Sequence, residues 1–144
     1  MQEVKIVINQ DILDKYLIYY FEKYPRRKVN HLKPFPPSLN RFTCMKRMAQ
    51  NALKQSYKEF SMWMASYFQI ANLNLDKATI IFAFYFKNHV RRDFDNLLLT
   101  PKFLNDGFVN AGVFKDDNGE CLKLEFESFK YDKLNPRIEI VIRY

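Results

Sequence analysis

The strongest constraint on the fold is a nine-residue apolar run, ATIIFAFYF, at residues 78–86. β-Branched and aromatic residues dominate the run, and it lacks Gly, Pro and charge, which is typical of a strand buried in a sheet. It leads into the charged stretch RRDFDN at residues 91–96. If the chain stays extended there, Asp93 and Asp95 point to one side and Phe94 points to the other. The sequence therefore predicts a central strand that presents two carboxylates near its end.

A second acidic pair, Asp116 and Asp117, follows about one helix later in the chain. Carboxylate oxygens from separate elements suit Mg²⁺, which keeps several of its waters and takes few protein ligands. Asp is also a common loop residue, so two solvated loop ends explain the same spacing equally well. Both interpretations stay open at this point.

Length and composition predict one globular domain, residues 1–144. Nearly half of the residues are apolar and 17% are aromatic, which excludes a disordered chain. Cys44 and Cys121 are too few for a disulfide framework or a structural zinc site. No apolar run reaches transmembrane length, and no secretory signal is evident. We expect a cytoplasmic protein with no organic cofactor and no membrane partner.

The net charge of +7 lies in one part of the chain. Residues 1–60 contain twelve Lys or Arg and five Asp or Glu, whereas residues 61–144 contain eleven of each. A cationic half beside an acidic site is what a protein that processes a polyanion needs. A general contribution to solubility is the alternative explanation.

Hydrophobic periodicity predicts an α+β domain, a small mixed sheet with packed helices. The predicted strands are residues 4–8, 78–86, 121–129 and 137–143, and the predicted helices are residues 11–24, 44–67 and 102–111. Asp11 is the expected cap of the first helix, and Gly112 is expected to end the last one. The proline-rich segment at residues 34–42, PFPPSLNRF, predicts a stiff extended loop without helix.

Two basic segments are candidates for DNA contact. In the proline-rich loop, Asn40 and Arg41 could direct donors at a phosphate, although the loop could equally be a rigid connector. Lys46 and Arg47 open the long helix, where they face either solvent or DNA. These four residues form the first part of the predicted DNA-binding set.

Taken together, PFPPSLNRF at 34–42, RRDFDN at 91–96 and NAGVFKDD at 110–117 resemble the RusA family of Holliday-junction resolvases. The resemblance covers roughly residues 32–144 and leaves residues 1–31 as an N-terminal strand-helix extension. It implies a small homodimeric endonuclease, often encoded by phages and prophages. Such enzymes use Mg²⁺, with Mn²⁺ as a substitute, to nick four-way DNA junctions symmetrically in DNA recombination and repair.

The resemblance also implies roles for the acidic residues. Asp93, Asp95 and Asp117 match the metal-binding, catalytic carboxylates of the family, and Asp116 matches their acidic neighbour. Arg91, Arg92 and Asn96 flank them and complete the predicted DNA-binding set. The arginines are expected to hold adjacent phosphates, or else merely to offset the acidic cluster.

The family's catalytic lysine closely follows its DxDN motif. Counting without a gap places Leu99 there, and leucine cannot act in that role. Aligning backwards from Ala111-Gly112 places Lys102 there and implies about three inserted residues. We therefore assign Lys102, with Lys115 as the alternative.

A homodimer is expected because two symmetric nicks call for two identical sites. The helix at residues 11–24 and the segment at residues 63–70 are more aromatic than a monomer should need to expose. Two other functions remain open, namely a nuclease for flaps or forks and a non-catalytic junction-binding protein.

Overall fold

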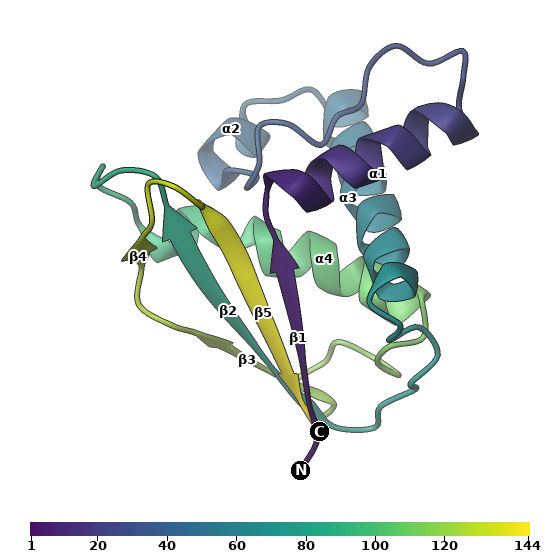
Figure 1. Cartoon of the computed structure of the whole chain (residues 1–144), viewed down its shortest axis with the longest axis vertical. Coiled ribbons are helices and arrows are strands. Elements are labelled where there is room, and N and C mark those ends of the chain that lie inside the picture. Colours follow the sequence, from purple (N-terminus) through teal and green to yellow (C-terminus); the bar gives the residue numbers. More distant parts are fainter.

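The protein, described over residues 1–144 by a computed structural model, is one mixed sheet with helices on one of its faces (Figure 1). The predicted α+β class is confirmed. The strand order is β1-β5-β2-β3, and the short β4 pairs with β2 beyond the end of β3. The elements are β1 (Glu3–Ile8), α1 (Gln10–Lys23), α2 (Leu39–Thr43), α3 (Arg47–Tyr67), β2 (Ala78–Phe86), η1 (Phe94–Leu97), α4 (Leu99–Asn110), β3 (Leu122–Phe126), β4 (Lys130–Tyr131) and β5 (Arg137–Arg143).

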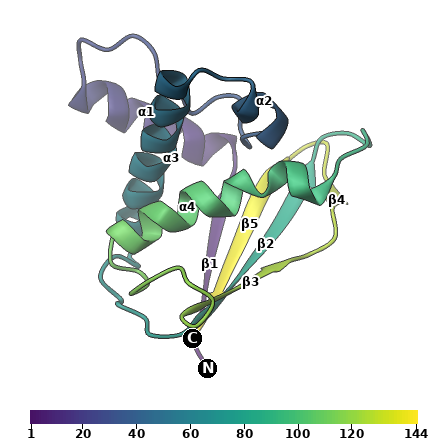
Figure 2. The ribbon, with the colours of Figure 1, turned by 180° about the vertical axis from the view of Figure 1, so that it is seen from behind.

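Strand β2 is the predicted central strand, and its bounds match the prediction. It pairs antiparallel with β5 and parallel with β3, and Ile80, Phe82 and Phe84 are buried in the core. Between β2 and β3, helix α4 crosses one face of the sheet (Figure 2). In the parallel pair, Ala78 lies opposite Leu122, so β2 and β3 start at the same edge of the sheet.

Residues 1–31 belong to the same core as the rest of the chain. Strand β1 pairs with β5 along its whole length, and Ile6 and Ile8 are buried. Helix α1 is capped by Asn9, two residues before the predicted cap, because the Asn9 side chain accepts from the Ile12 backbone N–H at 3.0 Å. The extension therefore contributes an edge strand and a packed helix.

The proline-rich segment differs from the predicted extended loop without helix. The chain bends at residues 34–36, where the peptide bonds before Pro34 and Pro36 are cis, and residues 39–43 form α2. Ser38 caps this short helix by accepting from the Arg41 N–H at 3.4 Å. The prolines end at residue 37, so nothing after Ser38 prevents a helical turn.

The aromatic residues of α1 and α3 are largely used within the protomer. The Tyr16 ring lies 4.9 Å from Phe60 and 5.4 Å from Trp63 between centroids, and Tyr16 and Phe60 are fully buried. Ile70, at the end of this segment, is also buried. Tyr19 and Tyr67 in these segments remain 36% and 44% exposed, and the dimer interface stays a prediction.

Helices α3 and α4 cross in close contact at Gly107. A Cβ atom at this position would collide with Ser61 and with the Lys58 carbonyl, so the crossing requires glycine. Helix α4 begins at Leu99, three residues before the prediction. The helix ends at Asn110, and Gly112, the predicted stop, follows with a φ of +74°. None of the helices combines the length and the apolar character needed to cross a membrane.

Candidate active site

The chain after β2 folds back on itself through Arg92. The Arg92 guanidinium donates to the Asn88 carbonyl at 3.0 Å, the Asn88 side-chain oxygen at 2.8 Å and the Val90 carbonyl at 2.9 Å. It also lies over the Phe86 ring, 3.9 Å from its centroid. Arg92 thus holds the loop together and would have to give up these bonds to bind a phosphate. Arg91 is 91% exposed, and its one ionic contact is a 3.9 Å approach to Asp93.

Asp93 and Asp95 lie where this loop enters η1. Asp93 is extended, with φ of −107° and ψ of 137°, but the next four residues form a 3-10 helix. The Asn96 N–H donates to the Asp93 carbonyl at 3.2 Å and to the Asp95 carboxylate at 3.1 Å. The predicted extended arrangement of the two aspartates is therefore wrong, because the chain turns immediately after Asp93. Both carboxylates are exposed.

Phe94 lies between these aspartates in the sequence and packs in a separate aromatic cluster. Its ring lies 4.2 Å from Phe129 and 5.9 Å from Phe126 between centroids. Phe94 remains 43% exposed. The turn of the acidic pair thus presents a partly exposed aromatic ring where it contacts the end of β3.

Asn96 joins the two motif segments that are far apart in the sequence. Its side-chain oxygen accepts from the Ser38 hydroxyl at 3.1 Å and from the Asn40 backbone N–H at 3.0 Å. The amide oxygen that we assigned to DNA contact therefore positions the proline-rich loop against the acidic turn. Ser38 was not among the predicted site residues. The signal for it was its place as a capping residue after two prolines.

The remaining candidates for DNA contact lie on or just after the proline-rich loop. Asn40 and Arg41 are exposed on α2, which packs against η1, and Lys46 and Arg47 are exposed at the start of α3. None of the three cations among them forms an ion pair within the protein. They are therefore free to meet an anion.

The two candidate lysines lie at different ends of α4. Lys102 is exposed in the first turn of α4, the helix that follows the turn of Asp93 and Asp95, and its ammonium group is 3.7 Å from Asp106. Lys115 follows the far end of α4 and pairs with Asp76, just before β2. Of the two lysines, only Lys102 lies at the end of α4 that follows Asp93 and Asp95.

Asp116 and Asp117 lie at the opposite edge of the sheet from Asp93 and Asp95. They precede β3, which starts beside the first residue of β2, whereas the other pair follows the last residue of β2. Nine residues of strand span about 30 Å. No three His, Cys, Asp or Glu side chains in the protein come close enough together to hold a metal ion. Within one copy, the three carboxylates thus do not fit a Mg²⁺ site.

The loop that contains Asp116 has its own local structure. The Asp117 N–H and the Asn118 side chain donate to the Asp116 carboxylate at 2.7 and 2.8 Å. These bonds, with the Asp117 N–H as the main cause, lower the pKa of Asp116 below its ordinary value. Asp116 is thus held as an anion that shapes its turn, and the adjacent Asp117 carboxylate is exposed.

Comparison with known proteins adds no relative. No model of a known protein family matches the chain, and a search of curated proteins finds no match.

Proposed function

We propose that this protein is a divalent-cation-dependent endonuclease that acts on branched DNA, with the four-way junction as its substrate. The observation that carries the proposal is the contact between the two motif segments. Asn96 holds the loop with Asn40 and Arg41 against the turn with Asp93 and Asp95. An exposed acidic pair beside free cations is the arrangement that phosphodiester cleavage needs, because the cations hold the strand while the acidic pair serves the reaction.

A dimer would complete the acidic set. Since Asp117 lies at the far edge of the sheet, a second copy must supply the third carboxylate. Strand β3 is an edge strand of the sheet, with the exposed apolar residue Leu124 in it and the partly exposed Phe94 against its last residue, Phe126. If two β3 strands pair antiparallel about a two-fold axis, the start of each lies beside the end of the other. That pairing brings each Asp117 toward the Asp93 end of its partner.

The ion would be Mg²⁺ or Mn²⁺, held by Asp93 and Asp95 together with Asp117 of the other copy. Such an ion lowers the pKa of bound water and offsets charge on the phosphate. Lys102 lies at the start of α4, shortly after Asp93 and Asp95 in the chain. It would stabilise the negative charge that develops during cleavage. The protein would act on cytoplasmic DNA, in recombination and repair.

Cleavage of synthetic substrates tests this proposal. A labelled four-way junction is incubated with Mg²⁺, and EDTA, flap and fork substrates serve as comparisons. We expect paired nicks in the junction that require the metal. Cleavage of flaps or forks alone would redirect the proposal to another branched substrate. Junction binding without cleavage would indicate the non-catalytic alternative, which the absence of a metal cluster within one copy favours.

Mixing two inactive variants tests the shared site directly. Asp95→Asn and Asp117→Asn should each abolish cleavage. In a dimer of one copy of each, both substitutions fall in the same shared site, and the other site has wild-type residues. Co-refolding the two variants should therefore restore about a quarter of the wild-type nicking. If each site lay within one copy, the mixture would stay inactive.

A further inference from the structure

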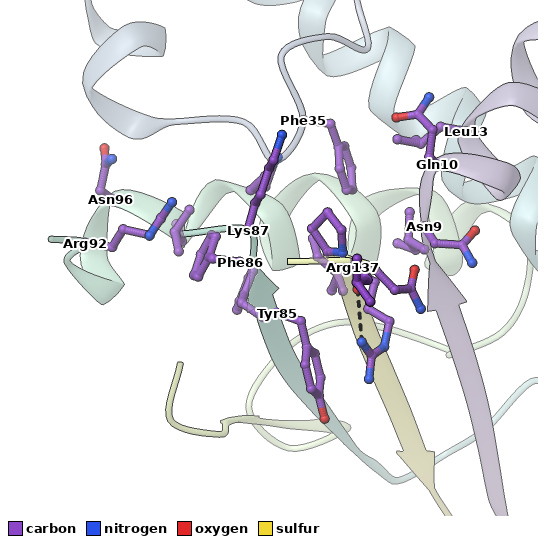
Figure 3. Close-up of a pocket in the computed structure, with 18 of the residues that line it drawn as sticks. Asn9, Gln10, Leu13, Phe35, Tyr85, Phe86, Lys87, Arg92, Asn96 and Arg137 are labelled. Carbon is purple, nitrogen blue, oxygen red and sulfur yellow. Dashed lines mark hydrogen bonds between the residues drawn. The ribbon is translucent and has the colours of Figure 1, made fainter. Parts of the chain in front are cut away.

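A cavity of about 500 Å³ opens beside Asp93, at the end of β2 where the candidate active site lies (Figure 3). Its walls come from five parts of the chain, namely the junction of β1 with α1, the proline-rich loop, the end of β2, the turn at residues 92–97 and the start of β5 with the loop before it. The volume lies in the range of small-ligand sites. The N-terminal extension, for which the sequence suggested no role, thus forms one wall of a cavity that borders the candidate active site.

The cavity is lined by aromatic and aliphatic side chains. Phe35 contributes from the proline-rich loop, Phe86 from β2 and Leu13 from α1. The Phe35 ring is held by Tyr57, which stacks on it at 6.0 Å, and Phe86 is held by the guanidinium of Arg92. Phe86 already has Arg92 over its ring and Phe84 stacked on it with centroids 6.0 Å apart, so Phe35 is the stacking surface of the cavity.

A few polar groups stand at the rim. Lys87 makes no ion pair or hydrogen bond within the protein, and Figure 3 shows it rising beside Phe35. The Gln10 amide donates to Asp14 at 2.8 Å, which leaves its oxygen without a partner. Asp93 is the only carboxylate that lines the cavity. The cavity thus combines a stacking surface, a free amide oxygen and a free cation.

We propose that this cavity receives one unstacked nucleobase of the DNA strand that passes Asp93. The inference rests on the proposed function and names a subsite for the same substrate. A base would stack on Phe35, its polar edge would meet Gln10, and its phosphate would lie outside near Lys87. Bases next to a strand crossover have fewer stacking partners than bases within a duplex, so their removal is less costly. The base held here would select the position of the nick.

Photochemical cross-linking identifies the base and the residues that it meets. The probe is a four-way junction with 5-iodouracil at one position near the crossover, moved along the strand in successive substrates. We expect one position to cross-link to peptides that contain Phe35 or Phe86. Replacing that nucleotide with an abasic site should weaken binding about tenfold, as measured by fluorescence anisotropy.

A matched pair of variants tests whether the cross-link depends on access to the cavity. Gln10→Trp places a large ring at the rim and should reduce the cross-link at least fivefold. Ile18→Trp is the control, because Ile18 is exposed on the same helix and does not line the cavity. It should cross-link like the wild type. Circular dichroism checks that both variants fold, and if Gln10→Trp does not, the cross-linked peptides and the abasic junction decide.

The outcomes separate this inference from the proposed function. Junction binding with cross-links elsewhere, or with no effect of the abasic site, overturns the base-binding cavity and leaves the nuclease proposal standing. Cross-links within the cavity without cleavage in Mg²⁺ support the cavity and overturn the nuclease. Failure to bind any DNA overturns both.

Discussion

The acidic loops lie at the two ends of strand β2, which we call the two edges of the sheet, and they differ in how they are held. At the end of β2, Asn96 joins the turn of Asp93 and Asp95 to a loop more than fifty residues earlier in the chain. At the start of β3, the Asp116 carboxylate accepts only from its neighbours Asp117 and Asn118, and the preceding Lys115 bonds to the Leu75 carbonyl and pairs with Asp76. A side chain of the first acidic turn thus reaches a distant loop, whereas the Asp116 side chain shapes only its own turn.

This difference has a consequence for function. The edge built from distant segments also has the free cations, the cavity and the aromatic surface. The other edge offers Asp117 on an exposed turn, which suits a group that reaches into a neighbouring copy. Helix α4 separates the two edges, and its contact with α3 at Gly107 fixes its position.

The largest expected effect distinguishes the lysines of the two edges. Because a catalytic lysine acts on charge that develops in the transition state, Lys102→Ala should lower the junction-cleavage rate by about 10²–10³-fold with little change in affinity. Single-turnover cleavage and anisotropy measure these quantities. Lys115→Ala is the comparison. If it removes the activity while Lys102→Ala does not, the assignment of the lysine is wrong.

The next effect concerns the helix between the edges. Gly107→Ala forces a Cβ atom into Ser61 and the Lys58 carbonyl, so it should lower the free energy of unfolding by about 1–3 kcal/mol. Urea denaturation measures the change. Gly119→Ala is the control, since nothing lies within 4 Å of its added Cβ, and it should change stability by less than about 0.5 kcal/mol. Equal stability of the two variants would show that α4 is not held at Gly107.

A smaller effect compares the asparagines of the two loops. Asn96→Ala removes the acceptor for Ser38 and Asn40 and should cost about 1 kcal/mol, with faster hydrogen exchange at the Asn40 amide. Asn118→Ala removes bonds only to Asp116, Glu120 and Cys121 and should cost less than about 0.5 kcal/mol. A larger loss for Asn118→Ala would reverse the contrast between the two edges.

The smallest effect is the pH dependence of the local loop. The pKa of Asp116 is lowered in the folded protein, so the folded loop binds the proton less well than the unfolded chain. The stabilisation is therefore present above the unfolded pKa and is lost as the pH falls through the folded pKa, from about pH 4 downward. The protection factor of the Asp117 amide, its exchange rate relative to that of an unstructured peptide at the same pH, should fall in that window, and Asp116→Asn should remove this dependence. An unchanged protection factor in acid would show that the carboxylate does not hold the turn.

Much of the secondary structure follows from local patterns in the sequence. The apolar run of β2, the alternation of β5 and the helical spacing of α1 each identify their element, because burial of one face requires that period. Errors of a few residues in the predicted start of a helix arise where two nearby residues can serve equally well as its cap. Asn9 and Asp11 are both good helix caps, and the fold uses the first.

The tertiary structure alone decided how the candidate site is assembled. Sequence motifs on either side of α4 suggested one carboxylate cluster, but a helix that connects parallel strands returns the chain to the opposite edge of the sheet. Asp117 is therefore far from Asp95 within one copy. The pairing of Asn96 with Ser38 and Asn40, and the cavity between Phe35 and Phe86, likewise depend on contacts between distant segments. Hydrophobic periodicity reports which face of an element is buried, but not which other segment covers it.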